Sequence, residues 1–274
     1  MSSTETNSVC EPIIFSSDGF CLSGTLHLPP GVCKPPVVVG SHGLLSTGDS
    51  PKQVALAQKC NQCGMAFFRF DHRGCGQSKG IFNEVTSLEN RCNDLINAVY
   101  MLRSRKDLGA QVGLFGSSMG GATCLTAATM IDVGPIVTVA APVRISLIGR
   151  EKELTALPGS EAIPMNLEFD ISDKLSQVRH ILMFHGDADE VVPVSDVIEI
   201  YEKAGRPKRR IVQKHGDHLM SNIRHQESFV RESVLWFKTG FGRRNMQGGH
   251  FMPTLQYIGD MTCNWKIYGK TETW

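Results

Sequence analysis

A Gly-x-Ser-x-Gly pattern joins two segments of different character. Residues 112–117 are a short apolar run typical of a buried strand, and residues 122–128 are small and compatible with a helix. A strand that turns directly into a helix at a serine forms a nucleophile elbow, whose backbone is strained at the serine. Gly116 and Gly120 are small enough for this turn, since larger side chains would collide with the neighbouring strand or helix. The pattern therefore predicts a reactive hydroxyl on Ser118.

The context of the pattern decides its interpretation, because five-residue glycine and serine patterns also occur in ordinary turns. Here the preceding strand and the following helix favour catalysis. The N-terminus of that helix would direct unpaired N–H groups and the positive end of its dipole at an oxyanion beside Ser118. An elbow of this type requires an acid and then a histidine, each after a later strand.

Both requirements have candidates downstream. Residues 180–184 form a short apolar run, predicted as a buried strand, and the loop that follows holds Asp187, Asp189 and Glu190. Residues 209–214 predict one more strand, closed by a loop with two histidines. We predict His218 as the base, with His215 as the alternative. The strand ends would place these loops at the same edge of the sheet as the elbow.

Five landmarks in this order resemble the serine α/β-hydrolase family, in its compact esterase-like branch (carboxylesterase or serine aminopeptidase-like). They are the segments 41–44 and 70–78, the elbow, the acid loop, and Asp217 with His218. The resemblance covers roughly residues 12–240. It implies an α/β class protein with the α/β-hydrolase fold, in which helices cover both faces of a mostly parallel central sheet.

The resemblance also implies roles for single residues. It favours Asp189 as the acid, since the family places its acid three residues after a His-Gly pair and shortly before Val-Pro; Asp187 is the second choice. It implies that the N–H groups of Leu44 and Met119 form the oxyanion hole. It further implies that the loop beginning at Asp71-His72-Arg73-Gly74 shapes the rim of the site.

These residues predict covalent catalysis. His218 would take the Ser118 proton as the hydroxyl attacks a carbonyl carbon, Asp189 would orient the imidazole, and water would release the acyl group. A serine at the elbow excludes dehalogenases and epoxide hydrolases, which need a carboxylate there. We expect hydrolysis of small to medium carboxylic esters. The alternatives are a serine peptidase or aminoacyl hydrolase and a non-catalytic binding protein of the same fold.

The remaining periodicity predicts alternating strands and helices. An antiparallel hairpin about Asp18-Gly19 opens the chain, with strands at 12–16 and 20–28. Further strands are expected at 36–41, 66–70 and 135–141, and helices at 53–63, 88–104 and 222–239. In the helix at 88–104 an apolar stripe should pack on the sheet, formed by Leu88, Cys92, Leu95, Ile96, Val99 and Leu102.

The domain prediction has two parts. Residues 1–240 form one hydrolase domain, with a possible small lid at about 143–175, and residues 241–274 form a C-terminal extension of unknown role. The rival interpretation of the lid is an ordinary helix and loop with apolar residues in the core. As a lid, the segment would line an acyl or aromatic pocket with Ile145, Leu147, Ile148, Leu154, Leu157, Ile163, Met165 and Leu167.

Composition limits the partners. A chain of 274 residues with 41% hydrophobic content can bury one sizeable core, and a net charge of +1 supplies no case for nucleic acid or an anionic membrane surface. The basic run at 206–210 is predicted to be a solvated turn leading into a strand. We expect a small-molecule ester as partner, no membrane insertion and a possible homo-oligomer.

The nine cysteines are an odd number for a disulfide framework and suit a reducing compartment. Together with a polar start that lacks a signal peptide, they predict a cytoplasmic protein. Cys60 and Cys63 have the spacing of a redox or zinc pair, but no second pair accompanies them, so packed thiols are favoured. A metal at His215 and His218 is disfavoured as well. We predict neither a cofactor nor a metal.

Overall fold

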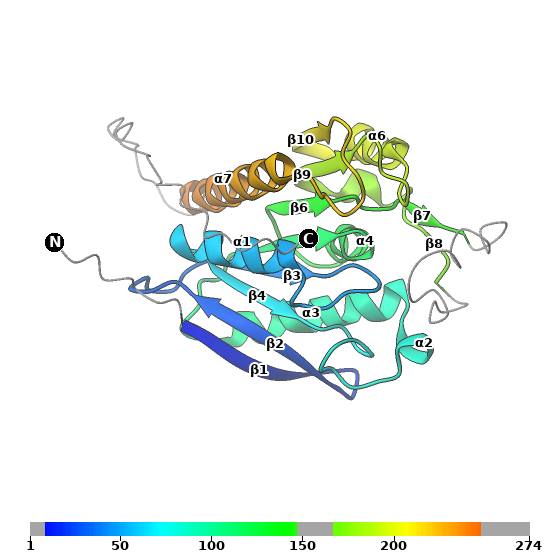
Figure 1. Ribbon diagram of the computed structural model, residues 1–274. Coiled ribbons are helices and arrows are strands. Elements are labelled where there is room, and N and C mark those ends of the chain that lie inside the picture. The colour runs from blue at the N-terminus through cyan, green and yellow to red at the C-terminus, as the bar shows by residue number, and fades with distance from the viewer. Residues whose placement is uncertain (1–8, 147–166, 248–274) are drawn as a thin grey trace, which may run out of the picture.

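The computed structural model describes residues 9–146 and 167–247, which are built around an eight-stranded sheet (Figure 1). Its strand order is β1-β2-β4-β3-β5-β6-β9-β10. The strands are β1 (Val9–Ser17), β2 (Phe20–Leu28), β3 (Val37–Ser41), β4 (Ala66–Phe70), β5 (Val112–Ser117), β6 (Ile136–Val139), β9 (Arg179–Gly186) and β10 (Gly205–Gln213).

Strand β2 is antiparallel to both of its neighbours, β1 and β4, and all other pairs in the sheet are parallel. The turn between β1 and β2 has positive φ at Asp18 (47°) and Gly19 (84°), as a tight hairpin turn of the primed type requires. The predicted N-terminal hairpin and the mostly parallel sheet are confirmed. Because β3, β4, β5, β9 and β10 are parallel, their carboxyl ends share one edge.

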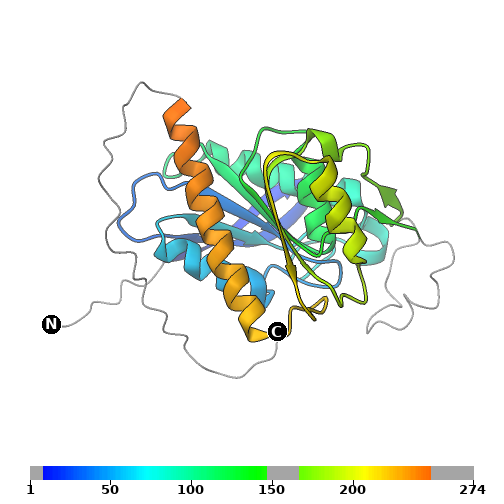
Figure 2. The same cartoon turned by 90° about the horizontal axis from the view of Figure 1, so that it is seen from above.

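Helices cover both faces of the sheet, as predicted (Figures 1 and 2). On one face, α1 (Pro51–Gln62) and α7 (Ile223–Gln247) lie side by side and bury Leu56 and Phe229. The other face carries α3 (Leu88–Ser104), α4 (Met119–Ala127) and α6 (Val194–Lys203). The smaller elements are the helix α2 (Phe82–Val85), the 3-10 turn η2 (Leu175–Gln177), and a separate antiparallel pair, β7 (Arg144–Ile145) and β8 (Phe169–Asp170).

Helix α3 has the predicted bounds and the predicted apolar face. Its N-cap residue Ser87 accepts a hydrogen bond from the Asn90 N–H through its side chain, which satisfies one of the free donors at the helix start. The stripe from Leu88 to Leu102 packs into the apolar core beneath the sheet. Two polar residues of α3, Arg91 and Asp94, are buried as well.

Two sequence predictions about the C-terminal half are wrong. The helix expected at 222–239 continues to Gln247, and Phe241 is buried against Phe237, so the apolar periodicity extends beyond Thr239. The basic run expected as a turn lies within β10. An edge strand tolerates such a run because charged side chains there remain solvated, and Pro207 lies at the register shift near its start.

The predicted lid and C-terminal extension fall largely outside the described residues. Pairing of Ile145 with Phe169 closes the base of the segment between β7 and β8. Its flanking residue Leu167 is buried. Residues 147–166 and 248–274 are not described, so the lid, the extension and the domain division stay predictions. Among helices in the described ranges, none is long and apolar enough to cross a membrane.

Candidate active site

The Ser118 backbone adopts the strained elbow geometry, with φ 54° and ψ −123° between β5 and α4. Its N–H donates to the Val139 carbonyl on β6 at 2.8 Å, which fixes the turn against the sheet. The turn is crowded: a Cβ on Gly116 would lie 2.2 Å from the Gly120 carbonyl oxygen, and one on Gly120 would lie 2.0 Å from that of Ser41. The predicted need for glycine at both positions is thus a direct steric fact.

The structure brings the three predicted catalytic side chains together at the carboxyl edge of the sheet. Nε2 of His218 lies 3.2 Å from Oγ of Ser118, and Nδ1 lies 2.9 Å from Oδ2 of Asp189. Asp189 follows β9 and His218 follows β10, so two strand ends position them against the elbow. The Asp189 carboxylate is fully buried, and the His218 side chain is 14% exposed. The arrangement suits proton transfer from the hydroxyl to Nε2.

Backbone groups hold the acid in place. The N–H groups of Val191 and Val192 donate to Oδ1 of Asp189 at 2.9 and 2.8 Å. Burial alone would raise the pKa of Asp189, but the hydrogen bond and charge of His218, with these two N–H groups, lower it below its ordinary value. Behind the loop, Nε2 of buried His185 donates to the Val192 carbonyl at 2.8 Å. Asp189 is therefore held as a carboxylate.

The alternative acid and the alternative base considered from the sequence, Asp187 and His215, interact with each other. Asp187 accepts a hydrogen bond from the His215 backbone N–H through Oδ1. Both side chains are exposed and belong to the same pair of loops. They tie the acid loop to the histidine loop, while Asp189 and His218 face the serine.

The predicted oxyanion donors belong to the two segments that flank Ser118. Met119 is the first residue of α4, so its N–H has no acceptor within the helix. The other segment follows β3. A Cβ on Gly43 would lie 3.7 Å from the Ser118 Cβ, so the peptide leading to Leu44 passes close to the nucleophile. The oxyanion-hole role of Leu44 and Met119 stays a prediction.

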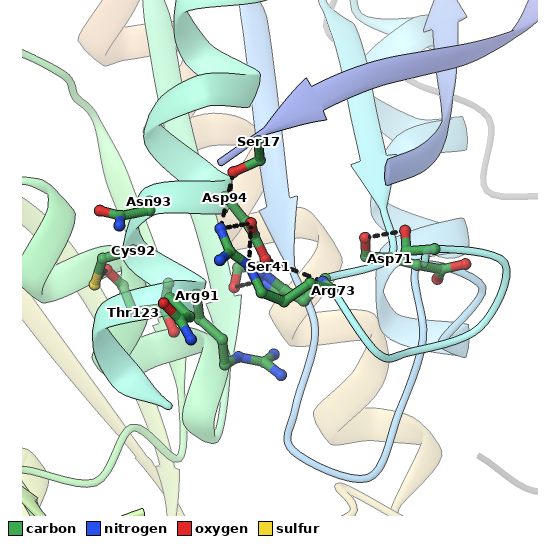
Figure 3. Close-up of polar contacts among 12 residues, drawn as sticks. Ser17, Ser41, Asp71, Arg73, Arg91, Cys92, Asn93, Asp94 and Thr123 are labelled. Carbon is green, nitrogen blue, oxygen red and sulfur yellow. Dashed lines mark hydrogen bonds and ion pairs between the residues drawn. The ribbon is translucent and has the colours of Figure 1, made fainter. Parts of the chain in front are cut away.

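A buried polar cluster lies beside the site and was not predicted. Nε and Nη2 of Arg73 donate to Oδ1 of Asp94 at 2.9 and 2.7 Å, and the Arg73 backbone N–H donates to Oδ2 (Figure 3). His72 links Asp94 to Ser41, with Nε2 2.8 Å from the Ser41 Oγ. These side chains point inward, so the loop at 71–74 organises the interior as well as any rim. Its contacts join residues 17 to 94, far apart in sequence, which local patterns do not reveal.

The structure holds no candidate for a second kind of centre in the ranges it describes. No group of three histidine, cysteine or acidic side chains there is placed to bind a metal. Neither Cys60 nor Cys63 forms a disulfide, nor does any other cysteine of the described segments.

The sequence and the fold agree with a known family. The family described as serine aminopeptidase, S33, matches residues 34–156, which include the elbow and both segments around it. This match falls on the segments whose geometry builds the serine site. The match and the fold support the serine α/β-hydrolase family for this chain. It is a hydrolase.

Two curated relatives align with most of this chain at 27% and 26% identity. This hydrolase is 27% identical over 253 residues to the uncharacterized protein YfhR of Salmonella typhi, covering 85% of this chain and 82% of the relative. It is 26% identical over 216 residues to the mitochondrial palmitoyl-protein thioesterase ABHD10 of Mus musculus, covering 68% of this chain and 70% of that protein. Both alignments span most of the hydrolase.

Among solved structures, Est1E from Butyrivibrio proteoclasticus with bound ferulic acid superposes with a TM-score of 0.70. The two share 21% identity, and the match covers 83% of this hydrolase and 99% of Est1E. At this identity the similarity establishes the fold.

Proposed function

We propose that this hydrolase cleaves carboxylic esters of small to medium size through an acyl-enzyme on Ser118. The observation that carries the proposal is the continuous hydrogen-bonded chain from Ser118 Oγ through His218 to the buried Asp189. A serine hydroxyl is a weak nucleophile at neutral pH, and an adjacent imidazole is the usual means of activating it.

The proposed reaction has two halves. In the first, His218 Nε2 takes the Ser118 proton as Oγ attacks the ester carbonyl, and the same proton then passes to the departing alcohol. In the second, water gives one proton to His218 as it attacks the acyl carbon, and His218 passes that proton to Ser118 Oγ as the acid departs. Asp189 keeps Nδ1 protonated and stabilises the imidazolium. The N–H groups of Leu44 and Met119 would stabilise each tetrahedral intermediate by a few kcal/mol per donor.

Exposed apolar residues next to the proposed catalytic groups support an acyl group as the part of the substrate that binds. Leu45 is 45% exposed and follows Leu44, while Leu219 is 55% exposed and follows His218. Two exposed leucines, each next to a proposed catalytic group, offer apolar surface to a substrate. They favour an apolar acyl chain over a charged one.

A thioester is the second candidate substrate. Two of the relatives carry names of this kind: the mouse palmitoyl-protein thioesterase above, and the thiohydrolase aneE of Aspergillus aculeatus, 29% identical over 128 residues. The same serine chemistry serves both classes, because the thiolate leaves in place of the alkoxide.

Paired substrates test the proposal. Nitrophenyl esters of increasing acyl length and thioesters of the same acyl groups are offered to the parent protein and to Ser118→Ala. We expect ester hydrolysis that Ser118→Ala abolishes, with a length optimum at short to medium chains. Turnover confined to thioesters would favour the second candidate. An aminoacyl nitroanilide is offered as a further substrate to test for peptidase activity. Activity that survives Ser118→Ala would overturn the serine mechanism.

A further inference from the structure

We propose that Arg91 is a positioning residue for the oxyanion hole, holding the peptide between Gly43 and Leu44 from the buried side. The inference rests on the proposed function, because it concerns the same oxyanion donors. Arg91 lies on α3, far from the serine in sequence, and its side chain is the largest of the fully buried ones.

Arg91 contacts the His42 ring and the Cys75 side chain, and it also donates to main-chain carbonyls. Its Nη2 donates to the carbonyl oxygen of His42 and, at 3.3 Å, to that of Gly43. These are successive carbonyls of the loop that leaves β3 and passes Ser118. Arg91 therefore holds the loop at two successive peptide groups, the second of which contains the Leu44 N–H.

The geometry of the peptide bond lets these hydrogen bonds fix the direction of the Leu44 N–H. The Gly43 carbonyl and the Leu44 N–H belong to one planar trans peptide, so they point in opposite directions. A carbonyl fixed toward Arg91 directs the Leu44 N–H away from Arg91. A cation bound to the carbonyl also polarises the peptide and strengthens the N–H as a donor. Both effects serve an amide that must face a developing negative charge.

The same carbonyl has a second buried donor. Nδ1 of His42 donates to the Gly43 carbonyl at 2.7 Å, and Nε2 of His42 accepts from the His72 N–H at 3.1 Å. This pattern needs a neutral imidazole with its proton on Nδ1. Burial, and after it the charge of Arg91, keep the pKa of His42 well below its ordinary value, which maintains that form.

Helix α3 braces the loop at a second point. Asp94, one turn after Arg91, reaches Ser41 through His72, whose Nε2 lies 2.8 Å from Ser41 Oγ. The two side chains diverge from the helix: Asp94 meets Arg73, and Arg91 extends in another direction (Figure 3). Residues 41–43 are thereby held at both ends from one rigid helix.

A purely structural ion pair does not account for Arg91. Its neighbour Asp94 is already paired with Arg73 on two nitrogens. Among the described residues no carboxylate lies within ion-pair distance of Arg91, and its Nε and Nη1 have no hydrogen-bond partner. Burying a cation in this way lowers stability. Apart from a side-chain hydrogen bond with Cys75, the groups that its guanidinium holds belong to the loop beside Ser118.

The test compares Arg91→Met and Arg91→Lys with Arg105→Met, a control in which an arginine paired to Glu11 and Asp107 near the surface is removed. Three readouts are used: hydrogen–deuterium exchange of residues 41–48, kcat and KM for a nitrophenyl ester, and the rate at which a fluorophosphonate labels Ser118. Circular dichroism checks folding.

We expect Arg91→Met to increase exchange at 41–48 and to lower both kcat and the labelling rate by about 10²-fold, with KM within about threefold of the parent. Arg91→Lys should fall between, since an ammonium reaches the carbonyls with less exact geometry. Arg105→Met should change neither exchange at 41–48 nor kcat.

Two results would overturn the inference: unchanged exchange at 41–48 in folded Arg91→Met, or faster exchange with kcat and labelling within about threefold of the parent. Should the parent itself neither hydrolyse esters nor react with the fluorophosphonate, the proposed function fails, while the exchange experiment still decides whether Arg91 holds the loop.

Discussion

His218 presents Nδ1 to both carboxylate oxygens of Asp189, at 3.0 Å from Oδ1 and 2.9 Å from Oδ2. A proton on Nδ1 can therefore be accepted by either oxygen of Asp189. If the proton were on Nε2 instead, Nδ1 would have no proton to donate to Asp189. The imidazole is held in the tautomer whose Nε2 lone pair faces Ser118. The orientation comes from strands β9 and β10, whose ends carry the two residues.

Replacement of the acid should lower kcat with little loss of stability. In Asp189→Asn the amide can donate to Nδ1, which favours the wrong tautomer, and we expect kcat to fall on the order of 10³ to 10⁴-fold. Asp187→Asn is the matched control from the same loop and should stay within about threefold of the parent. The measurement is kcat for a nitrophenyl ester. Equal losses in the two variants would mean that Asp189 has no special role.

The packing at the elbow predicts a large effect from a single methyl group. Gly116→Ala would place a Cβ 2.2 Å from the Gly120 carbonyl oxygen, so the strand and the helix must separate. We expect the free energy of unfolding to fall by about 3 kcal/mol. Gly242→Ala, with nothing within 4 Å of the new Cβ in helix α7, should be neutral or slightly stabilising. Urea denaturation of both variants measures this difference. Equal free energies of unfolding for the two variants would contradict the crowded packing at the elbow.

The buried cluster beside the site makes stability depend on Asp94. Burial alone would raise its pKa, but hydrogen bonds from His72 and Arg73 hold the pKa at about 2. Asp94→Asn leaves the Arg73 guanidinium buried beside a neutral group, and should reduce the free energy of unfolding by about 3 to 5 kcal/mol. Asp18, which also contacts Arg73, has a side chain 47% exposed, so Asp18→Asn should cost about 1 kcal/mol or less. Similar losses of stability in Asp94→Asn and Asp18→Asn would contradict the prediction that Asp94 is the more important partner of Arg73.

Two buried histidines predict a loss of stability in mild acid. Burial, with the charge of Arg69 for His27 and of Arg91 for His72, lowers both pKa values to about 4. The unfolded chain takes up these protons near pH 6.5 and the folded chain does not, so the unfolded state binds more protons between these values. Stability is complete above pH 6.5 and declines as the pH falls toward 4.

Urea denaturation from pH 7.5 to 5.0 measures that decline. The slope of the free energy of unfolding against pH should be small above pH 6.5 and positive below it, by up to about 1.4 kcal/mol per pH unit for each proton. His27→Gln should reduce this slope, because the variant lacks one of the two histidines whose pKa is lowered in the folded protein. A slope of zero would show that these histidines titrate normally in the folded protein.

Much of this molecule was predictable because its signals are local. Strand 66–70 and helix 88–104 have the predicted bounds, since each is an uninterrupted apolar run or stripe. The elbow was recognisable because steric crowding demands glycine at fixed spacing around Ser118. Asp189 needed the family resemblance, since residue type alone left Asp187 equally suitable.

The remainder depends on contacts between distant segments. Arg73 pairs with Asp94 and Ser17 across the sheet edge, and Arg91 reaches the carbonyls of His42 and Gly43. Arg91 and Asp94 are polar positions of helix α3 that would favour solvent, and only the assembled sheet shows them to be interior. The basic run in β10 was misassigned for a related reason: an edge strand and a solvated turn accept the same residues.

The most direct test of the account is to trap the covalent intermediate. The protein is mixed with a nitrophenyl ester for milliseconds, quenched in acid and analysed by intact mass and peptide mass spectrometry. The account predicts one acyl group per chain, located on Ser118 and missing from Ser118→Ala. Burst release of nitrophenol with the acyl group on another residue, or turnover that forms no adduct, would contradict it.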